Sequence, residues 1–244
     1  MLSTPPMPTG STANLALKAS IVLNILAAVV IGPRLWGRWA DSRDQPPTPA
    51  PVIHRTTLFE ELRPVAGSIV FAGDSLVQMC EWAELLGDHR VVNRGVFGET
   101  TATLREHVAV IGRDRPSAVF LMVGINDLAH GRTMDAITAD YTAIVQSLST
   151  KTPRVVVQSV LPVNHSTYKY RVQSNDIVAL NARLRDLAAQ FGATYLDVGA
   201  RLTDASGDLG EHFTADGVHL NGEAYRLWRG SLLPLIPDLD KPVD

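Results

Sequence analysis

Apolar and polar positions along residues 54–244 follow two different spacings in turn, which predicts alternating strands and helices. Short apolar runs are typical of buried strands, and apolar residues spaced about 3.6 apart are typical of amphipathic helices. The expected strands are 68–72, 91–95, 118–123, 154–160 and 193–197. The expected helices are 75–86, 101–111, 134–148, 174–190 and 222–233. This alternation predicts an α/β fold whose parallel sheet is covered by helices on both faces.

Composition and charge restrict the classes of function. The chain has 244 residues and a formal net charge of -3, with its lysines and arginines scattered. It therefore offers no electrostatic case for a nucleic-acid-binding protein. The single cysteine, Cys80, excludes a disulfide within the chain and a cysteine-rich metal site. Because Cys80 falls in an expected helix, we interpret it as a small buried apolar residue.

Residues 1–40 are expected to lie outside the domain, because residues 13–32 are strongly apolar. Their uncharged part, 19–32, is shorter than the roughly 20 residues of a spanning helix, unless Lys18 snorkels and the helix continues toward Trp36. Three interpretations stay open. They are an uncleaved membrane anchor, which we favour, a cleaved signal peptide, and a helix that packs on the domain or lies in the membrane surface.

A Pro-rich linker, 41–53, is expected to join this segment to a globular domain at 54–244. The two signals for membrane orientation disagree. Three arginines between residues 34 and 43 outnumber Lys18, which favours a cytoplasmic domain. A Pro-rich spacer is instead usual in exported enzymes. We expect a membrane-anchored or exported protein with an extracytoplasmic domain.

Polar residues gather where the expected strands end and in the loop before the last helix. In parallel α/β sheets, ligands bind at the carboxyl ends of the strands. An active site is therefore expected at this edge of the sheet. The clusters are Gly73-Asp74-Ser75, Asn93-Arg94-Gly95, Gly124-Ile125-Asn126-Asp127, Pro162-Val163-Asn164-His165 and Asp216-Gly217-Val218-His219.

Ser75 is the candidate nucleophile, because a serine at a strand-to-helix turn presents its hydroxyl above the sheet. Asp74 or Ser75 could equally be an ordinary helix N-cap. The Gly-x-Ser-x-Gly elbow is incomplete, since Gly73 precedes the serine but Val77 stands where the second glycine would be. The serine therefore needs support from other residues.

His219 is the candidate base, because a serine nucleophile needs a group that accepts its proton near neutral pH. Among the seven histidines, His219 has a carboxylate, Asp216, three residues before it in a glycine-containing loop. That spacing allows the carboxylate to orient the imidazole. The same residues also fit a generic turn with a loop histidine, and His212 is a rival base.

Acyl transfer also needs donors for the negative charge that develops on the carbonyl oxygen. We expect these donors to be the N–H groups of Ser75 and Gly95 and the side-chain amide of Asn126. Gly95 could instead serve a tight loop, and Asn126 could cap the next helix.

Three further polar residues lie beside these candidates. Asp127 is interpreted as structural, through a cap or a hydrogen bond to its loop. Asn164 and His165 follow the fourth expected strand. They either line the substrate pocket or belong to a solvated loop.

Taken together, the ordered clusters resemble the SGNH/GDSL hydrolase superfamily over about residues 66–236. The segments 71–78 and 95–101 look most like the branch that contains platelet-activating-factor acetylhydrolase catalytic subunits and their bacterial relatives. The resemblance implies a flavodoxin-like three-layer α/β/α sandwich with a parallel five-stranded sheet and no cofactor. It implies a nucleophile, a base and its partner at Ser75, His219 and Asp216, and an oxyanion hole from Ser75, Gly95 and Asn126.

The expected function is a serine esterase that hydrolyses a short-chain acyl ester, with acetyl as one candidate, of a carbohydrate or lipid. An acyltransferase, a lysophospholipase or thioesterase, and a membrane-tethered binding module without catalysis are the alternatives. A dinucleotide-binding domain is disfavoured, because the first turn reads Gly-Asp-Ser-Leu-Val-Gln and not Gly-x-Gly-x-x-Gly.

Overall fold

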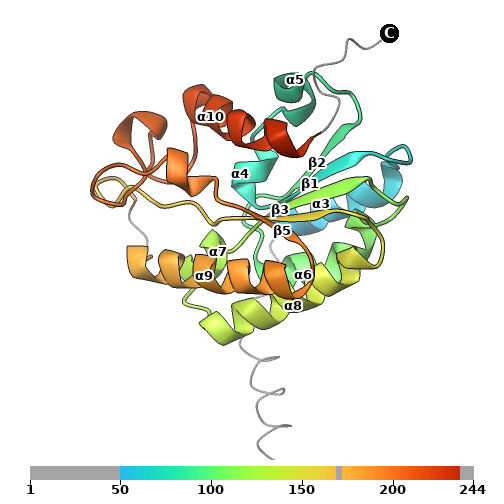
Figure 1. The fold of residues 1–244 in the computed structure, drawn as a ribbon, viewed down its shortest axis with the longest axis horizontal. Coiled ribbons are helices and arrows are strands. Elements are labelled where there is room, and N and C mark those ends of the chain that lie inside the picture. The colour runs from blue at the N-terminus through green and yellow to red at the C-terminus, as the bar shows by residue number, and fades with distance from the viewer. Residues whose placement is uncertain (1–49, 169–171, 237–244) are drawn as a thin grey trace, which may run out of the picture. The chain divides into compact units, whose positions relative to one another are not determined.

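The computed structural model describes residues 50–168 and 172–236 (Figure 1), all within the unit Thr48–Asp244. The predicted N-terminal hydrophobic helix and most of the predicted linker lie outside these residues. Among the helices that the structure does describe, none is long and apolar enough to cross a membrane.

A five-stranded parallel sheet forms the centre of the domain, as predicted. The order of its strands is β2-β1-β3-β4-β5, which is the flavodoxin-like order. In this order the chain reverses direction across the sheet between β1 and β3, where such sheets usually bind their ligands. The strands are β1 Ile69–Gly73, β2 Val91–Gly95, β3 Ala118–Met122, β4 Val155–Gln158 and β5 Thr194–Leu196.

Helices cover both faces of the sheet, with α6, α8 and α9 on one side and α4, α5 and α10 on the other (Figure 1). The α-helices are α3 Ala50–Glu61, α4 Ser75–Gln78, α5 Trp82–Leu86, α6 Thr101–Ile111, α7 Ile125–Ala129, α8 Met134–Ser149, α9 Ser174–Gln190 and α10 Gly222–Leu232. The short 3-10 helices are η1 Gly199–Arg201, η2 Glu211–Phe213 and η3 Leu233–Leu235.

Alternating side chains of the strands build two hydrophobic cores. In β1, Val70 and Ala72 face the core under α6, α8 and α9, whereas Ile69 and Phe71 face the core under α4, α5 and α10. The Phe71 ring stacks on the Trp82 ring of α5 with 4.3 Å between centroids. Because both of their faces are buried, the central strands β1 and β3 read as continuous apolar runs in the sequence.

The expected helix 75–86 is divided into α4 and α5, which is a difference from the prediction. The side-chain amide of Asn93 donates to the carbonyl oxygens of Val77, Gln78 and Cys80 at 2.9–3.1 Å. These carbonyl oxygens would otherwise accept the next hydrogen bonds of a continuous helix, but they accept from a side chain of β2 instead. The helix stops at this point and restarts at Trp82.

Helix α3 begins at Ala50, inside the segment expected to be linker. It packs through Val52 and Phe59 against Val96, which follows β2. Arg55 Nε also donates to the Gly95 carbonyl oxygen at 3.1 Å. The start of the domain therefore lies against the end of β2, next to one of the polar clusters.

Candidate active site

Ser75, His219 and Asp216 form one continuous chain of hydrogen bonds. The Ser75 Oγ lies 3.0 Å from His219 Nε2. The opposite ring nitrogen, His219 Nδ1, lies 2.6 Å from Asp216 Oδ2. With the ring proton on Nδ1, the carboxylate accepts from the imidazole and leaves Nε2 free to receive the serine proton. The structure thus brings together the three residues predicted for nucleophile, base and partner.

The turn after β1 places the serine. Gly73 ends β1 with a φ of +153°, which L side chains rarely adopt. Asp74 is the N-cap of α4, because its Oδ1 accepts from the Leu76 N–H at 3.0 Å. Ser75 is the first residue of the helix, so its N–H has no intrahelical acceptor. Asp74 is therefore the helix cap, and the Ser75 side chain is not needed for capping.

A compact loop holds Asp216 and His219. Asp216 Oδ1 accepts from the N–H groups of Val218 and His219, at 3.0 and 2.8 Å. The same carboxylate therefore folds the turn with one oxygen and orients the imidazole with the other. Gly217 has a φ of +89°, and its carbonyl oxygen accepts from the Asn164 N–H at 2.8 Å. This bond docks the loop on the segment that follows β4.

The charge of Asp216 is favoured by these contacts. Partial burial acts to raise its pKa, but hydrogen bonds from the His219 ring and from the N–H groups of His219 and Val218 outweigh that effect. They lower the pKa of Asp216 to about 2. The carboxylate is therefore ionised at neutral pH, ready to stabilise an imidazolium at His219.

An aromatic ring covers the imidazole of His219. The Phe97 ring stacks on His219 with 5.7 Å between centroids and 21° between planes. The Phe97 N–H donates to Gln78 Oε1 at 2.5 Å, which ties the residue to α4. Phe97 is nevertheless half exposed, so one face of its ring borders solvent. The sequence reasoning did not single out Phe97, although it lies in the motif 95–101.

The predicted oxyanion donors differ in availability. Asn126 Nδ2 donates one hydrogen to the Glu99 carbonyl oxygen at 2.8 Å, which leaves its second hydrogen for another acceptor. The Gly95 N–H donates to Asn93 Oδ1 at 2.8 Å and is therefore already used. Gly95 has no special backbone conformation either. A Cβ atom there would stand 2.3 Å from the Gln78 backbone nitrogen, so a glycine is needed for close packing of β2 on α4.

Asn164 is used inside the protein. Its side chain is buried, donating to the Leu209 carbonyl oxygen at 2.8 Å and accepting from the Ser166 N–H and hydroxyl. Asn164, a candidate for the lining of the substrate pocket, thus joins its own loop to the one that carries Leu209.

His165 is also engaged through both ring nitrogens. Nδ1 lies 2.9 Å from Asp208 Oδ1, and Nε2 lies 2.9 Å from the Val172 carbonyl oxygen. The Val172 carbonyl, followed by the Asp208 carboxylate, raises the pKa of His165, against the opposing effect of partial burial. Both acceptors favour the charged ring, which suits an ion pair better than a substrate contact.

Asp127, Cys80 and His212 take no part in the chain of hydrogen bonds from Ser75 to Asp216. Asp127 is fully buried and accepts from the Thr101 N–H and hydroxyl and from Arg132, which agrees with its interpretation as a structural carboxylate. Cys80 is buried, and burial raises the pKa of its thiol to about 12, so the thiol is not a nucleophile near neutral pH. The rival base His212 is exposed on η2, and its ring forms no hydrogen bond with any described residue.

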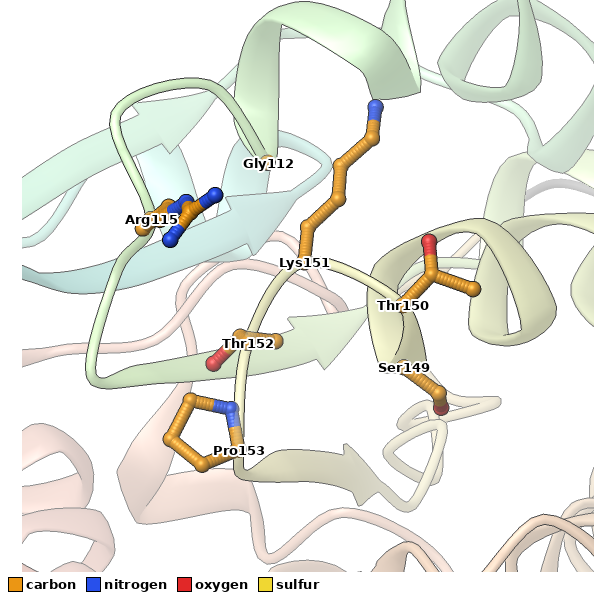
Figure 2. A pocket seen from close by; sticks show the side chains of 7 residues that line it. All are labelled: Gly112, Arg115, Ser149, Thr150, Lys151, Thr152 and Pro153. Carbon is orange, nitrogen blue, oxygen red and sulfur yellow. The ribbon is translucent and has the colours of Figure 1, made fainter.

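An open pocket of about 520 Å³ adjoins the triad. It is lined by Ser166, Thr167, Tyr168, Ala215, Asp216, Val218 and His219. A second hollow, of about 650 Å³, lies at the opposite edge of the sheet, between the loops that precede β3 and β4 (Figure 2). There the side chain of Lys151, from the loop before β4, packs against Gly112. Gly112 and Arg115 belong to the loop before β3. This second hollow is lined by none of the predicted site residues.

Among the described residues, no group of three His, Cys, Asp or Glu side chains could hold a metal ion.

Comparison with known proteins adds independent evidence. Residues 71–227 match the model of the GDSL-like Lipase/Acylhydrolase family. The alpha1 subunit of platelet-activating factor acetylhydrolase IB from Homo sapiens is 32% identical over 165 residues, which cover 64% of this chain and 70% of the human protein. The Gallus gallus alpha2 subunit is 28% identical over 166 residues, with 64% and 70% covered.

Solved structures show the same fold. A structure described as a platelet activating factor from Streptococcus pneumonia has a TM-score of 0.71 and 26% identity, covering 84% of this chain and 98% of its own. Axe2, an acetylxylan esterase from Geobacillus stearothermophilus, has a TM-score of 0.58 at 15% identity and covers 74% and 98%. The family match spans all five polar clusters, and we conclude that this chain belongs to the GDSL-like lipase/acylhydrolase family and is a carboxylic ester hydrolase.

Proposed function

We propose that the protein hydrolyses a short-chain acyl ester of a carbohydrate or a lipid through an acyl-enzyme on Ser75. The observation that carries the proposal is the hydrogen-bonded chain from Ser75 through His219 to Asp216. It supplies a nucleophile, a base and a counter-charge in the order that acyl transfer to serine requires.

The reaction proceeds in two halves. His219 Nε2 takes the Ser75 proton while Oγ attacks the carbonyl carbon, and the carbonyl oxygen gains the negative charge. The C–O bond to the alcohol breaks, and the alcohol leaves with the proton from His219. Water then gives a proton to His219 and attacks the acyl carbon. The acid is released when that proton returns to Ser75 Oγ.

The negative charge needs donors on the other side of the carbonyl. We expect three donors, of which two are the Ser75 N–H and the second hydrogen of Asn126 Nδ2. For the third we propose the Gly98 N–H in place of Gly95, whose N–H already binds Asn93. Gly98 lies between Phe97, which stacks on His219, and Glu99, which binds Asn126. Its N–H has no acceptor among the described residues.

The substrate class draws on the relatives and on the pocket. The names of two similar proteins indicate acetyl esters as substrates. One is a platelet-activating factor acetylhydrolase, and the other is an acetylxylan esterase. The open pocket beside His219, lined by Ser166, Thr167 and Tyr168 among others, gives space for a bulky alcohol. A small acyl group with a larger leaving alcohol fits this arrangement.

The deciding experiment compares the wild type with Ser75→Ala on p-nitrophenyl acetate. We expect the substitution to abolish hydrolysis and to prevent labelling by a fluorophosphonate. Retained hydrolysis would overturn the proposal, and an unlabelled, inactive wild type would favour the binding-module alternative. A series of acyl chain lengths, with ester and thioester leaving groups and with acceptor sugars, distinguishes an acetyl esterase from a lysophospholipase, a thioesterase or an acyltransferase.

The membrane anchor in residues 1–40 remains a proposal, supported by the apolar run at 13–32. The full chain is expected in the membrane fraction and a variant that begins at residue 48 in the supernatant. Equal distribution of both proteins would contradict the anchor. Protease accessibility of the domain in intact cells would decide its orientation.

A further inference from the structure

We propose that Glu99 is a positioning residue for the oxyanion-binding side of the site, where it aims the side-chain amide of Asn126. It would do so through a partly buried contact with His107. The inference rests on the proposed function, because it assigns Glu99 a part in that same reaction.

The Glu99 side chain is held by two partly buried partners. It is fully buried, and its Oε1 accepts from the Thr103 hydroxyl at 2.5 Å. Its Oε2 lies 3.0 Å from His107 Nε2, and the His107 side chain is only 11% exposed. Thr103 and His107 stand one and two turns into α6, so the carboxylate is held along the side of that helix. A carboxylate removed from water is stable only with such partners.

The backbone of the same residue holds Asn126. The Glu99 carbonyl oxygen accepts one hydrogen of Asn126 Nδ2 at 2.8 Å, and the Glu99 N–H closes a turn onto the Val96 carbonyl oxygen at 3.1 Å. An amide group is planar, so a bond to one of its hydrogens sets the direction of the other. The position of the Glu99 carbonyl therefore decides where the free hydrogen of Asn126 points.

These two sets of contacts make Glu99 a link between α6 and the catalytic edge of the sheet. If the carboxylate loses its partners, the side chain and the carbonyl that belongs to it can shift. The Asn126 amide would follow, and displacement of a catalytic group by about 1 Å can cost about 10²-fold in rate. The effect should appear in kcat, because an oxyanion donor acts on the transition state and not on the bound ester.

The test is a double-mutant cycle with Glu99→Met and Asn126→Ala on p-nitrophenyl acetate. Methionine keeps the size of the side chain but accepts no hydrogen bond from His107. We expect Glu99→Met to lower kcat by about 10- to 100-fold with KM little changed. In the Asn126→Ala background the same substitution should lower kcat by less than about threefold, because the group that it positions is gone. An equal loss in both backgrounds would overturn the inference.

Two further sets of variants keep the result interpretable. His107→Leu removes the donor to Glu99 and should reproduce the loss and the coupling if Glu99→Met does not fold, whereas His107→Gln keeps an N–H donor and should restore kcat. Asp88→Asn is the matched control, since Asp88 is also a buried carboxylate but pairs with Arg90 at the other edge of the sheet. It should leave kcat within about twofold in both backgrounds.

The outcomes separate this inference from the proposed function. An active Ser75→Ala protein would overturn the proposed function whatever the cycle shows. An inactive Ser75→Ala protein with additive Glu99 and Asn126 effects would overturn only the positioning role. An Asn126→Ala protein with unchanged kcat would also overturn that role, because there would be no donor to aim.

Discussion

The Cα of Gly73 lies so close to Met122 that a Cβ atom on it would stand 1.7 Å from the Met122 carbonyl oxygen. The contact joins the ends of β1 and β3 two residues before Ser75. Only glycine allows both this approach and the φ of +153°.

Gly73→Ala should therefore lower the free energy of unfolding by about 3 kcal/mol or more, because the clash is with backbone and cannot relax by rotation of a side chain. Gly67→Ala is the matched control. Gly67 also has a positive φ, of +82°, but a Cβ atom added to it would meet no other atom within 4 Å. It should lose only about 1–2 kcal/mol. Urea unfolding of both variants checks the difference, and equal losses would contradict it.

The acid of the triad should matter for the chemical step more than for binding. Asp216→Asn removes the charge that faces His219 and can hold the ring in the wrong tautomer. We expect kcat to fall by about 10²–10⁴-fold with KM little changed. His212→Ala should retain wild-type kcat, because His212 lies outside the hydrogen-bonded chain. Steady-state kinetics on p-nitrophenyl acetate test both variants, and an inactive His212→Ala protein would reopen the choice of base.

Asp74 should make the fold less stable as the pH rises. Burial raises its pKa from 3.8 to about 7, and its Oδ2 has no partner among the described residues. Between these two values the folded protein binds the proton more tightly than the unfolded chain. The contribution of Asp74 to the free energy of unfolding therefore decreases as the pH rises through this window.

Asp74→Asn keeps an N-capping side chain and removes the titration. Its stability relative to the wild type should increase by roughly 2–4 kcal/mol between about pH 4 and about pH 7. Urea unfolding of both proteins across that range gives the difference. A difference that stays constant with pH would show that Asp74 titrates normally.

His165 should stabilise the fold most at acidic pH, where its ring is charged. Its pKa is raised above the ordinary value of 6.5 by the Val172 carbonyl and then by Asp208. Its contribution to stability is therefore complete below pH 6.5 and is lost as the pH rises through the higher pKa of the folded state.

His165→Leu should accordingly destabilise the protein more at acidic pH than at alkaline pH. His130→Leu is the control, since His130 is exposed and its ring forms no hydrogen bond with a described residue. Chemical unfolding at the two pH values tests the prediction. An equal loss for His165→Leu at both would mean that the ring acts only through packing.

The sequence predicted those features that depend on local pattern. Strand positions follow from apolar runs, and β1 and β3 lie within a residue or so of the expected 68–72 and 118–123. The break between α4 and α5 could not be foreseen, because the side chain that causes it, Asn93, is on another strand. The start of α3 was hidden because the prolines before it indicate a linker.

The same distinction applies to the site. Ser75, His219 and Asp216 were identifiable because each has a local motif, and the structure brings them into contact. The use of the Gly95 N–H by Asn93 was not foreseen, because it depends on which way a side chain turns. Asn164 stands at the predicted edge of the sheet, but its side-chain oxygen and amide are consumed by neighbouring loops.

The acid and the base of the triad come from the single turn Asp216–His219, whereas the serine is 144 residues away from the histidine in the chain. The hydrogen bond between Ser75 and His219 therefore joins the turn after β1 to the turn that carries the Asp216–His219 pair. An insertion in a surface loop between Ser75 and this turn leaves the three-residue spacing of Asp216 and His219 unchanged. Such a site can tolerate remodelling of its substrate loops during evolution, provided that the turn still docks on the sheet.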